Sequence, residues 1–288
     1  MDLIPFKLKE CLAAGLAAAI ADSLFNPLEV IKVRLQFNNE ENVSIIRTIK
    51  QITNRNTFLG KFYELYYPGI YPTIYRGLCY TGCRIGFYPT IKSIICTEDD
   101  EKETFSTRFL AGSITGMIAC FLFNPLDLVR IRLQRNPYEF QSTFNGIKTI
   151  ANANGIVSLY MRGSLPSILR ATLLSGVQLS IYDSTKKLII SRYSISESIY
   201  VHAVSSLISG SCAQFIVMPI DILKSRIMGA KNSSNGMIAT FNLIIQARGI
   251  FGLWRGFIPA VLRQGPCLVV QFTLLEKFRR DIFGLTYL

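Results

Sequence analysis

A proline, an acidic residue and a basic residue recur together three times along this chain. Each acid follows its proline by two positions and precedes its base by three, which places the acid and the base on one face of a helix. The three pairs are Glu29 and Lys32, Asp127 and Arg130, and Asp221 and Lys224. A proline inside a helix removes one backbone hydrogen bond and bends the axis. We therefore expect three bent helices whose six charges meet at one end of a central cavity.

A second pattern, G-x-x-P-x-x-x-R, also occurs three times, in phase with the first. Its arginines are Arg76, Arg170 and Arg263. Under threefold symmetry these side chains converge near the middle of a membrane, where a buried arginine is costly unless it has a partner. A guanidinium matches a carboxylate through two hydrogen bonds, so the pattern favours a di- or tricarboxylate ligand. The alternative is that each arginine only ties neighbouring helices together.

The two patterns define an internal repeat of about a third of the chain. The first pattern begins at Pro27, Pro125 and Pro219, and these prolines are 98 and 94 residues apart. In each copy an apolar stretch rich in small residues leads into the charged pattern, and together they are long enough to span a bilayer. We therefore expect an all-α membrane protein whose repeats, residues 1–100, 101–194 and 195–288, form one transmembrane domain. Six transmembrane helices with pseudo-threefold symmetry and short surface helices would result.

The composition agrees with a membrane protein and disfavours several other classes. Half of the 288 residues are hydrophobic, yet 17% are charged and the formal net charge is +12. The basic residues are dispersed, which disfavours a nucleic-acid partner and favours lipid headgroups and an anionic solute. The seven cysteines form no paired framework and the chain has a single histidine, His202, so we expect neither a metal site nor a cofactor. No pair of nucleophile and base suggests an enzyme.

With both patterns in three copies, residues 8–280 resemble the mitochondrial carrier family, whose signature is P-x-[DE]-x-x-[KR]-x-[KR]. The resemblance is closest to the oxoglutarate and dicarboxylate carriers and to the uncoupling proteins. In that family the six charges of the first pattern form a salt-bridge network on the matrix side, which we call the matrix gate. The resemblance further implies that Gln36 and Gln134 brace this gate, whereas Met228 occupies the third equivalent position.

The family resemblance implies a second gate on the cytosolic side, from the pattern [FY]-[DE]-x-x-[KR] near the end of each even-numbered helix. Repeat 1 departs from this pattern because Pro89 replaces the acid. The other members of the expected cytosolic gate are Lys92, Asp183, Lys186, Glu276 and Arg279. With two carboxylates facing three bases, we expect the resting protein to favour the state that is open to the cytosol.

The resemblance also narrows the expected substrate. Arg170 followed by Ala171 looks like the carboxylate and keto-acid carriers. One polar layer further toward the cytosol, we expect three more substrate contacts, Arg84, Gln178 and Gln271. Uncoupling proteins usually carry a glutamate in place of Gln178, so the glutamine disfavours an uncoupling function for this chain.

Asp22 and His202 are the remaining ionisable candidates. Asp22 is either a proton-coupling carboxylate in the cavity or the counter-ion of Arg76 or another base. We assign it to the substrate-binding set as a counter-ion. For His202 we expect an interfacial position rather than a proton relay.

These features predict an alternating-access exchanger of small carboxylates such as malate, succinate or oxoglutarate. An uncoupling-protein-like transporter of protons and anions is the first alternative, and a non-transporting membrane scaffold is the second. The resemblance implies a multi-pass protein of the mitochondrial inner membrane that functions as a monomer, with both termini facing the intermembrane space.

The same resemblance implies structural cardiolipin, which in the family binds beside an aromatic-basic-glycine motif. Repeat 3 has Trp254-Arg255-Gly256 and repeat 2 has Arg162-Gly163, whereas repeat 1 reads Tyr67-Pro68-Gly69 without a base. We therefore expect the weakest cardiolipin site in repeat 1.

Overall fold

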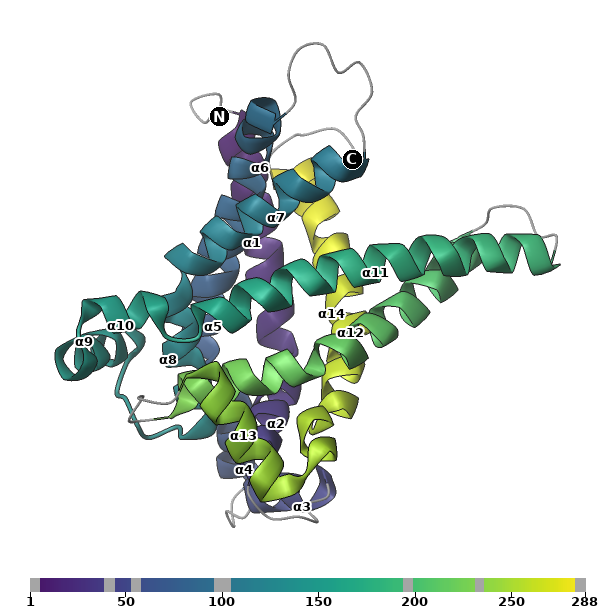
Figure 1. The fold of residues 1–288 in the computed structure, drawn as a ribbon. Coiled ribbons are helices and arrows are strands. Elements are labelled where there is room, and N and C mark those ends of the chain that lie inside the picture. Colours follow the sequence, from purple (N-terminus) through teal and green to yellow (C-terminus); the bar gives the residue numbers. More distant parts are fainter. Residues whose placement is uncertain are drawn as a thin grey trace.

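A computed structural model describes residues 6–38, 45–52, 58–95, 105–193, 199–230 and 236–282. Within these ranges every regular element is a helix, as an all-α fold requires. The helices of the three repeats pack around a common centre, and α11 (Ser164–Tyr193) and α12 (Ile199–Gly229) run together as a long pair that extends away from it (Figure 1).

The first segment of repeats 1 and 2 is two helices that meet at a sharp angle. In repeat 1, α1 (Phe6–Leu24) meets α2 (Asn26–Phe37) at 62°. In repeat 2, α7 (Phe105–Leu122) meets α8 (Asn124–Arg135) at 64°. The expected bends are therefore present, but the helix breaks one residue before Asn-Pro. Each proline then lies in the first turn of a new helix, where its missing N–H is tolerated.

An asparagine explains where these two helices break. The Asn26 side-chain nitrogen donates to the carbonyls of Tyr66 and Pro68 at 2.7 and 3.0 Å, just before the next spanning segment begins. Asn124 makes the corresponding bonds in repeat 2, for example to the Leu159 carbonyl at 2.8 Å. In repeat 3, Met218 replaces this asparagine, and α12 continues through Pro219. The prediction of a proline inside a helix is therefore wrong for two repeats and right for the third.

The second segment of each repeat begins at a glycine in the left-handed backbone region. Gly69, Gly163 and Gly256 have φ angles of 71°, 74° and 88°, which other residues adopt only at a cost. The helices that follow are α5 (Ile70–Arg76), a π-helical turn η1 (Gly77–Thr81) and α6 (Gly82–Ile95) in repeat 1, α11 in repeat 2, and α14 (Phe257–Lys277) with η3 (Phe278–Ile282) in repeat 3.

Two short elements, rather than one, join the two segments of each repeat. They are α3 (Ile45–Ile52) and α4 (Phe58–Tyr66), α9 (Thr143–Asn154) and α10 (Ile156–Met161), and α13 (Met237–Arg248) and η2 (Ile250–Trp254). In Figure 1, α9 and α10 lie beside α8, and α3 and α4 lie beside α2. Buried hydrophobic residues, such as Leu128 and Val129 with Ile150 and Leu159, hold α9 and α10 against α8.

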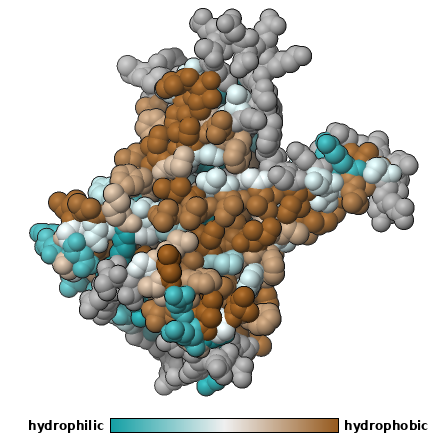
Figure 2. Space-filling view, in the orientation of Figure 1, coloured by the Kyte–Doolittle hydropathy of each residue, from teal (hydrophilic) through white to brown (hydrophobic). Residues whose placement is uncertain are grey.

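The outer faces of several helices are hydrophobic. Figure 2 shows such a face along α11 and α12, and on α12 Leu207 and Phe215 are 67% and 50% exposed. Two segments, 204–229 and 250–282, are long and apolar enough to cross a membrane by themselves. Counting each bent pair as one span gives up to four within the described residues. The expected six spans remain a prediction.

Candidate functional site

A small polar cavity lies where the three charged helix segments approach the three arginine-bearing helices. It is lined by Val33, Ile131, Gln134, Ser225 and nine charged residues: Glu29, Lys32, Arg76, Asp127, Arg130, Arg170, Asp221, Lys224 and Arg263. All six residues expected in the matrix gate and all three arginines of the second pattern are therefore brought together. The cavity has a volume of about 70 Å³, which is room for a few water molecules.

Two ion pairs of the matrix gate connect different repeats. Lys32 Nζ lies 2.8 Å from Asp221 Oδ2, and Lys224 Nζ lies 2.8 Å from Asp127 Oδ2. Both carboxylates are buried, with Asp221 3% and Asp127 7% exposed. These contacts hold repeat 3 to repeat 1 and to repeat 2 at this end of the cavity.

The third pair of the matrix gate has a different arrangement. Glu29 Oε2 lies 2.6 Å from Arg263 Nε. Arg130 is 6% exposed, and its Nε and Nη2 atoms have no hydrogen-bond partner among the residues that the structure describes. The expected matrix gate is therefore held together by two lysine-aspartate pairs and by an arginine from the second pattern.

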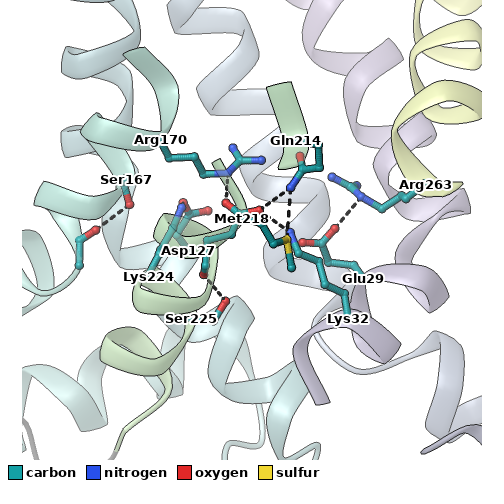
Figure 3. A network of polar contacts seen from close by, with 12 residues as sticks. Glu29, Lys32, Asp127, Ser167, Arg170, Gln214, Met218, Lys224, Ser225 and Arg263 are labelled. Atoms are coloured by element: carbon teal, nitrogen blue, oxygen red, sulfur yellow. Dashed lines mark hydrogen bonds and ion pairs between the residues drawn. The ribbon is translucent and has the colours of Figure 1, made fainter. Parts of the chain in front are cut away.

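The three arginines of the second pattern, called the arginine layer below, all contact matrix-gate carboxylates. Arg76 Nε pairs with Asp127 and Arg170 Nε pairs with Asp221, just as Arg263 pairs with Glu29. Asp127 and Asp221 thus each hold a lysine and an arginine at the same time. Figure 3 shows Arg170 and Arg263 pointing into the centre of the network, where Arg263 meets Glu29. Sequence reasoning treated the two layers as separate, whereas the structure joins them in one network.

Gln214 is a member of this network that sequence reasoning missed. Its Nε2 atom donates to Asp221 Oδ2 at 3.0 Å, and the side chain is 3% exposed (Figure 3). The sequence could have indicated this role, because Gln214 is a polar residue inside the apolar stretch that leads to Pro219.

Asp22 has the contact that the counter-ion interpretation requires. Its Oδ1 atom lies 3.0 Å from Arg263 Nη1, and the Cys267 thiol donates to the same oxygen at 3.6 Å. The base is therefore Arg263 rather than Arg76. Arg263 lies between Asp22 and Glu29, on the side of the cavity formed by repeats 1 and 3.

The two expected glutamine braces occupy different surroundings. Gln134 lines the cavity and donates from Nε2 to Asn26 Oδ1 at 3.1 Å. Gln36 is fully buried, and its amide has no hydrogen-bond partner within the described part of the chain. Met228 is also fully buried, in a hydrophobic cluster with Val33 and Leu133. Gln134 is thus the one of the two glutamines whose side chain the structure places at the cavity.

The expected contacts further toward the cytosol lie outside this cavity. Arg84 is exposed, and Ala171, Gln178 and Gln271 are partly exposed. None of these four residues is among those that line the cavity.

The expected cytosolic gate is only partly described. Arg279 Nη2 lies 3.3 Å from Glu10 Oε1, so its described partner is an acid of α1 that sequence reasoning did not assign. Lys92 and Lys186 are partly buried and Glu276 is exposed. The side chains of Asp183 and His202 lie outside the described residues.

A set of arginines around the C-terminal ends of α2, α8 and α12 was also missed. Each donates to a backbone carbonyl at the end of a helix in the neighbouring repeat, where the helix dipole is negative. The bonds are Arg34 to Gln134 at 3.2 Å, Arg132 to Met228 at 3.3 Å, Arg162 to Ile227 at 3.0 Å and Arg255 to Asn38 at 3.0 Å. Burial and the nearby Arg132 lower the pKa of Arg162 to about 10. Two sequence patterns could have indicated this set. Arg34 and Arg132 are the second base of the family signature, and Arg162 and Arg255 directly precede a helix-starting glycine.

Comparison with known proteins gives a consistent result. The family model described as mitochondrial carrier protein matches residues 6–99, 101–193 and 196–284. A mitochondrial brown fat uncoupling protein 1 of Mesocricetus auratus is 26% identical over 279 residues, which cover 94% of this chain and 91% of that protein. A protein of Dictyostelium discoideum named probable mitochondrial 2-oxoglutarate/malate carrier is 29% identical over 286 residues, which cover 94% and 89%.

Proposed function

Because this chain belongs to the mitochondrial carrier family, and is therefore a transporter and not an enzyme, we propose that it exchanges small dicarboxylates or keto acids across the mitochondrial inner membrane. Malate, succinate and oxoglutarate are the substrates of this class that we consider first. A relative named as a 2-oxoglutarate/malate carrier supports this choice.

The charge balance of the cavity is the observation that carries the proposal. Six basic and three acidic side chains line it, and Asp22 adds a fourth acid through its contact with Arg263. Six bases against four acids leave an excess of two positive charges. In a partly buried site this excess attracts anions, and a dicarboxylate dianion neutralises it.

The contacts also suggest how the substrate opens the matrix gate. The arginine layer is already bound to Asp127, Asp221 and Glu29, and the remaining space is too small for a dicarboxylate. A substrate carboxylate must therefore replace a gate carboxylate on an arginine. Asp127 or Asp221 then loses its arginine, and with it one of the ion pairs that join neighbouring repeats. The free energy gained by substrate binding at the arginine layer offsets the cost of breaking the gate ion pairs, as alternating access requires.

An uncoupling-protein-like transport of protons and anions is the second candidate. It is favoured by the uncoupling protein among the relatives and by the position of Asp22, a carboxylate beside the network that carries a thiol contact. In this reading Asp22 would take up and release the transported proton. A non-transporting scaffold is less well supported, because it would not need an excess of buried positive charge.

The remaining parts of the proposal concern the setting of the protein. We place both termini in the intermembrane space and take the monomer as the functional unit. Structural cardiolipin would bind beside Gly163 and Gly256, where the preceding residue is an arginine. Asp183 and Lys186, with Glu276, Arg279 and Lys92, would close the cytosolic side after substrate release.

Exchange measured in liposomes tests the proposal. Purified protein is reconstituted with internal malate, and uptake of labelled malate, succinate, oxoglutarate or phosphate is compared. We expect counter-exchange of dicarboxylates, its loss in Arg170→Ala, and unchanged exchange in Lys148→Ala, since Lys148 is exposed on α9. A proton leak without exchange supports the uncoupling candidate. Normal exchange in Arg170→Ala contradicts the role given to the arginine layer.

A further inference from the structure

A second cavity, of about 370 Å³, lies between repeats 1 and 2, away from the charged network. One wall comes from α4, the start of α5 and the residues between them, and the other from the end of α8 and the segment that leads into α9. Its lining residues are Tyr63, Tyr67, Pro68, Gly69, Ile70, Tyr71, Pro72, Leu133, Pro137, Tyr138, Phe140, Gln141, Ser142 and Thr143. We call this cavity the tyrosine pocket.

The pocket occurs where repeat 1 departs from the other two repeats. In repeats 2 and 3 the residue before the helix-starting glycine is Arg162 or Arg255, and its guanidinium reaches across to carbonyls of the neighbouring repeat. In repeat 1 that residue is Pro68. Proline has no side chain that can cross the interface, so a space is left beside Gly69.

The walls of the pocket suit an organic cation. Four tyrosines and Phe140 line it, and no charged side chain is among its described lining residues. The Tyr63 and Tyr67 rings are stacked 4.5 Å apart, and the Tyr67 hydroxyl donates to that of Tyr71 at 2.8 Å. Aromatic faces attract ammonium groups, and quaternary ammonium most of all. The negative end of the α8 dipole, beside Leu133 and Pro137, acts in the same direction.

Two ionic groups beside the pocket, Glu64 and Arg34, have opposite charges. The Tyr138 hydroxyl donates to Glu64 Oε1 at 3.3 Å. Arg34 interacts electrostatically with Glu64 and with Tyr138, and its Nε is bonded to the Gln134 carbonyl behind the pocket. Because Glu64 offsets Arg34, the character of the pocket is set by its aromatic rings.

The opposite side of the pocket suits an anion. Thr143 is the first residue of α9, a helix of 12 residues, and is 4% exposed. Its hydroxyl oxygen is buried and has no hydrogen-bond partner among the described residues, although burying an unpaired hydroxyl is unfavourable. A phosphate oxygen at this place would accept the Thr143 proton and meet the positive end of the α9 dipole.

We propose that the tyrosine pocket binds the headgroup of a zwitterionic phospholipid, with the ammonium group among the tyrosines and the phosphate at Thr143. The missing arginine thus changes the class of lipid that this interface selects, from an anionic to a zwitterionic headgroup. This inference does not depend on which solute the protein carries.

Binding of soluble short-chain lipids tests the inference. Protein purified in a non-ionic detergent is titrated with dihexanoylphosphatidylcholine, with dihexanoylphosphatidylglycerol and with tetramethylammonium, and the dissociation constants are measured by native mass spectrometry. At the site that Pro68→Arg removes, we expect phosphatidylcholine to bind at least about fivefold more tightly than the anionic lipid, the size of effect that one cation–π contact gives. Tetramethylammonium alone should bind more weakly than phosphatidylcholine.

Four substitutions sharpen the test. Tyr67→Leu should weaken phosphatidylcholine binding about fivefold, whereas Tyr67→Phe should keep it because the ring remains. Pro68→Arg should fill the pocket, remove the preference for phosphatidylcholine and strengthen phosphatidylglycerol binding. Phe272→Leu, at an aromatic residue of α14 that is 58% exposed and lies outside these motifs, is the matched control and should leave all three constants unchanged.

Three results would overturn the inference. Equal binding of the two lipids would show that the pocket does not select a zwitterionic headgroup. An equal loss in Tyr67→Leu and Phe272→Leu would indicate general lipid contact around the protein. Binding of tetramethylammonium as tight as that of phosphatidylcholine would mean a site for free amines and not for a phospholipid.

Discussion

Neutralising Asp221 should destabilise this protein far more than neutralising a surface acid. Asp221 is 3% exposed and holds Lys32, Arg170 and Gln214 at once. Asp221→Asn leaves the buried Lys32 and the partly buried Arg170 without their anion, and breaking a buried pair in this way costs about 3–5 kcal/mol. At about 2–4 °C per kcal/mol for a large domain, the apparent Tm should fall by roughly 6–20 °C.

A matched control and a double substitution separate the effect from a general loss of stability. Arg280 and Asp281 form an ion pair whose side chains are 62% and 53% exposed, and Arg280→Gln should cost less than about 1 kcal/mol. Adding Lys32→Gln to Asp221→Asn removes one of the stranded cations and should recover part of the lost Tm. Thiol-dye thermal unfolding in detergent measures all four proteins. If Asp221→Asn matches Arg280→Gln, or if the double variant shows strictly additive losses, the coupling between Lys32 and Asp221 is refuted.

Three further predictions follow from features away from Asp221. Gly69→Ala should lower stability by about 1–2 kcal/mol because φ is 71°, whereas Gly112→Ala, with nothing within 4 Å of the added carbon, should not; equal Tm values for the two variants would contradict the strain. Arg255→Gln removes the bond to the Asn38 carbonyl and should cost about 1–3 kcal/mol, so an unchanged Tm would mean that this contact does not hold repeats 3 and 1 together. Pro89→Asp places an acid in the expected cytosolic gate and should reduce labelling, from the cytosolic side, of a cysteine placed in the cavity. Equal labelling of the two proteins would remove Pro89 as the cause of any bias toward the cytosol-open state.

The fold class could be predicted from the sequence because the internal repeat indicates it. Two patterns in phase, three times over, predicted an all-α carrier fold, and the family match covers all three repeats. The same threefold logic predicted that the six gate charges meet one another and that the three arginines converge, and the structure brings both sets to one cavity. Their roles in transport remain predictions.

Contacts that depend on side-chain length and rotamer were beyond the reach of sequence patterns. Spacing along a helix gives the face of Arg170 but not whether its guanidinium extends toward the cytosol or back to Asp221. The helix breaks depend on bonds from Asn26 and Asn124 to distant carbonyls, which no local pattern contains. The pocket beside Pro68 likewise depends on an arginine that is absent, so only comparison of the three interfaces reveals it.

The uninterrupted course of α12 through Pro219 has a mechanical consequence. Repeats 1 and 2 each have a joint, a single residue between two helices that meet at 62° or 64°, so their two halves can pivot with little loss of backbone hydrogen bonding. Repeat 3 has Met218 in place of the asparagine and a continuous helix instead. The first segment of repeat 3 is therefore expected to be more rigid than the bent first segments of repeats 1 and 2. We therefore expect the three repeats to move unequally during a transport cycle, despite the threefold symmetry of their sequences.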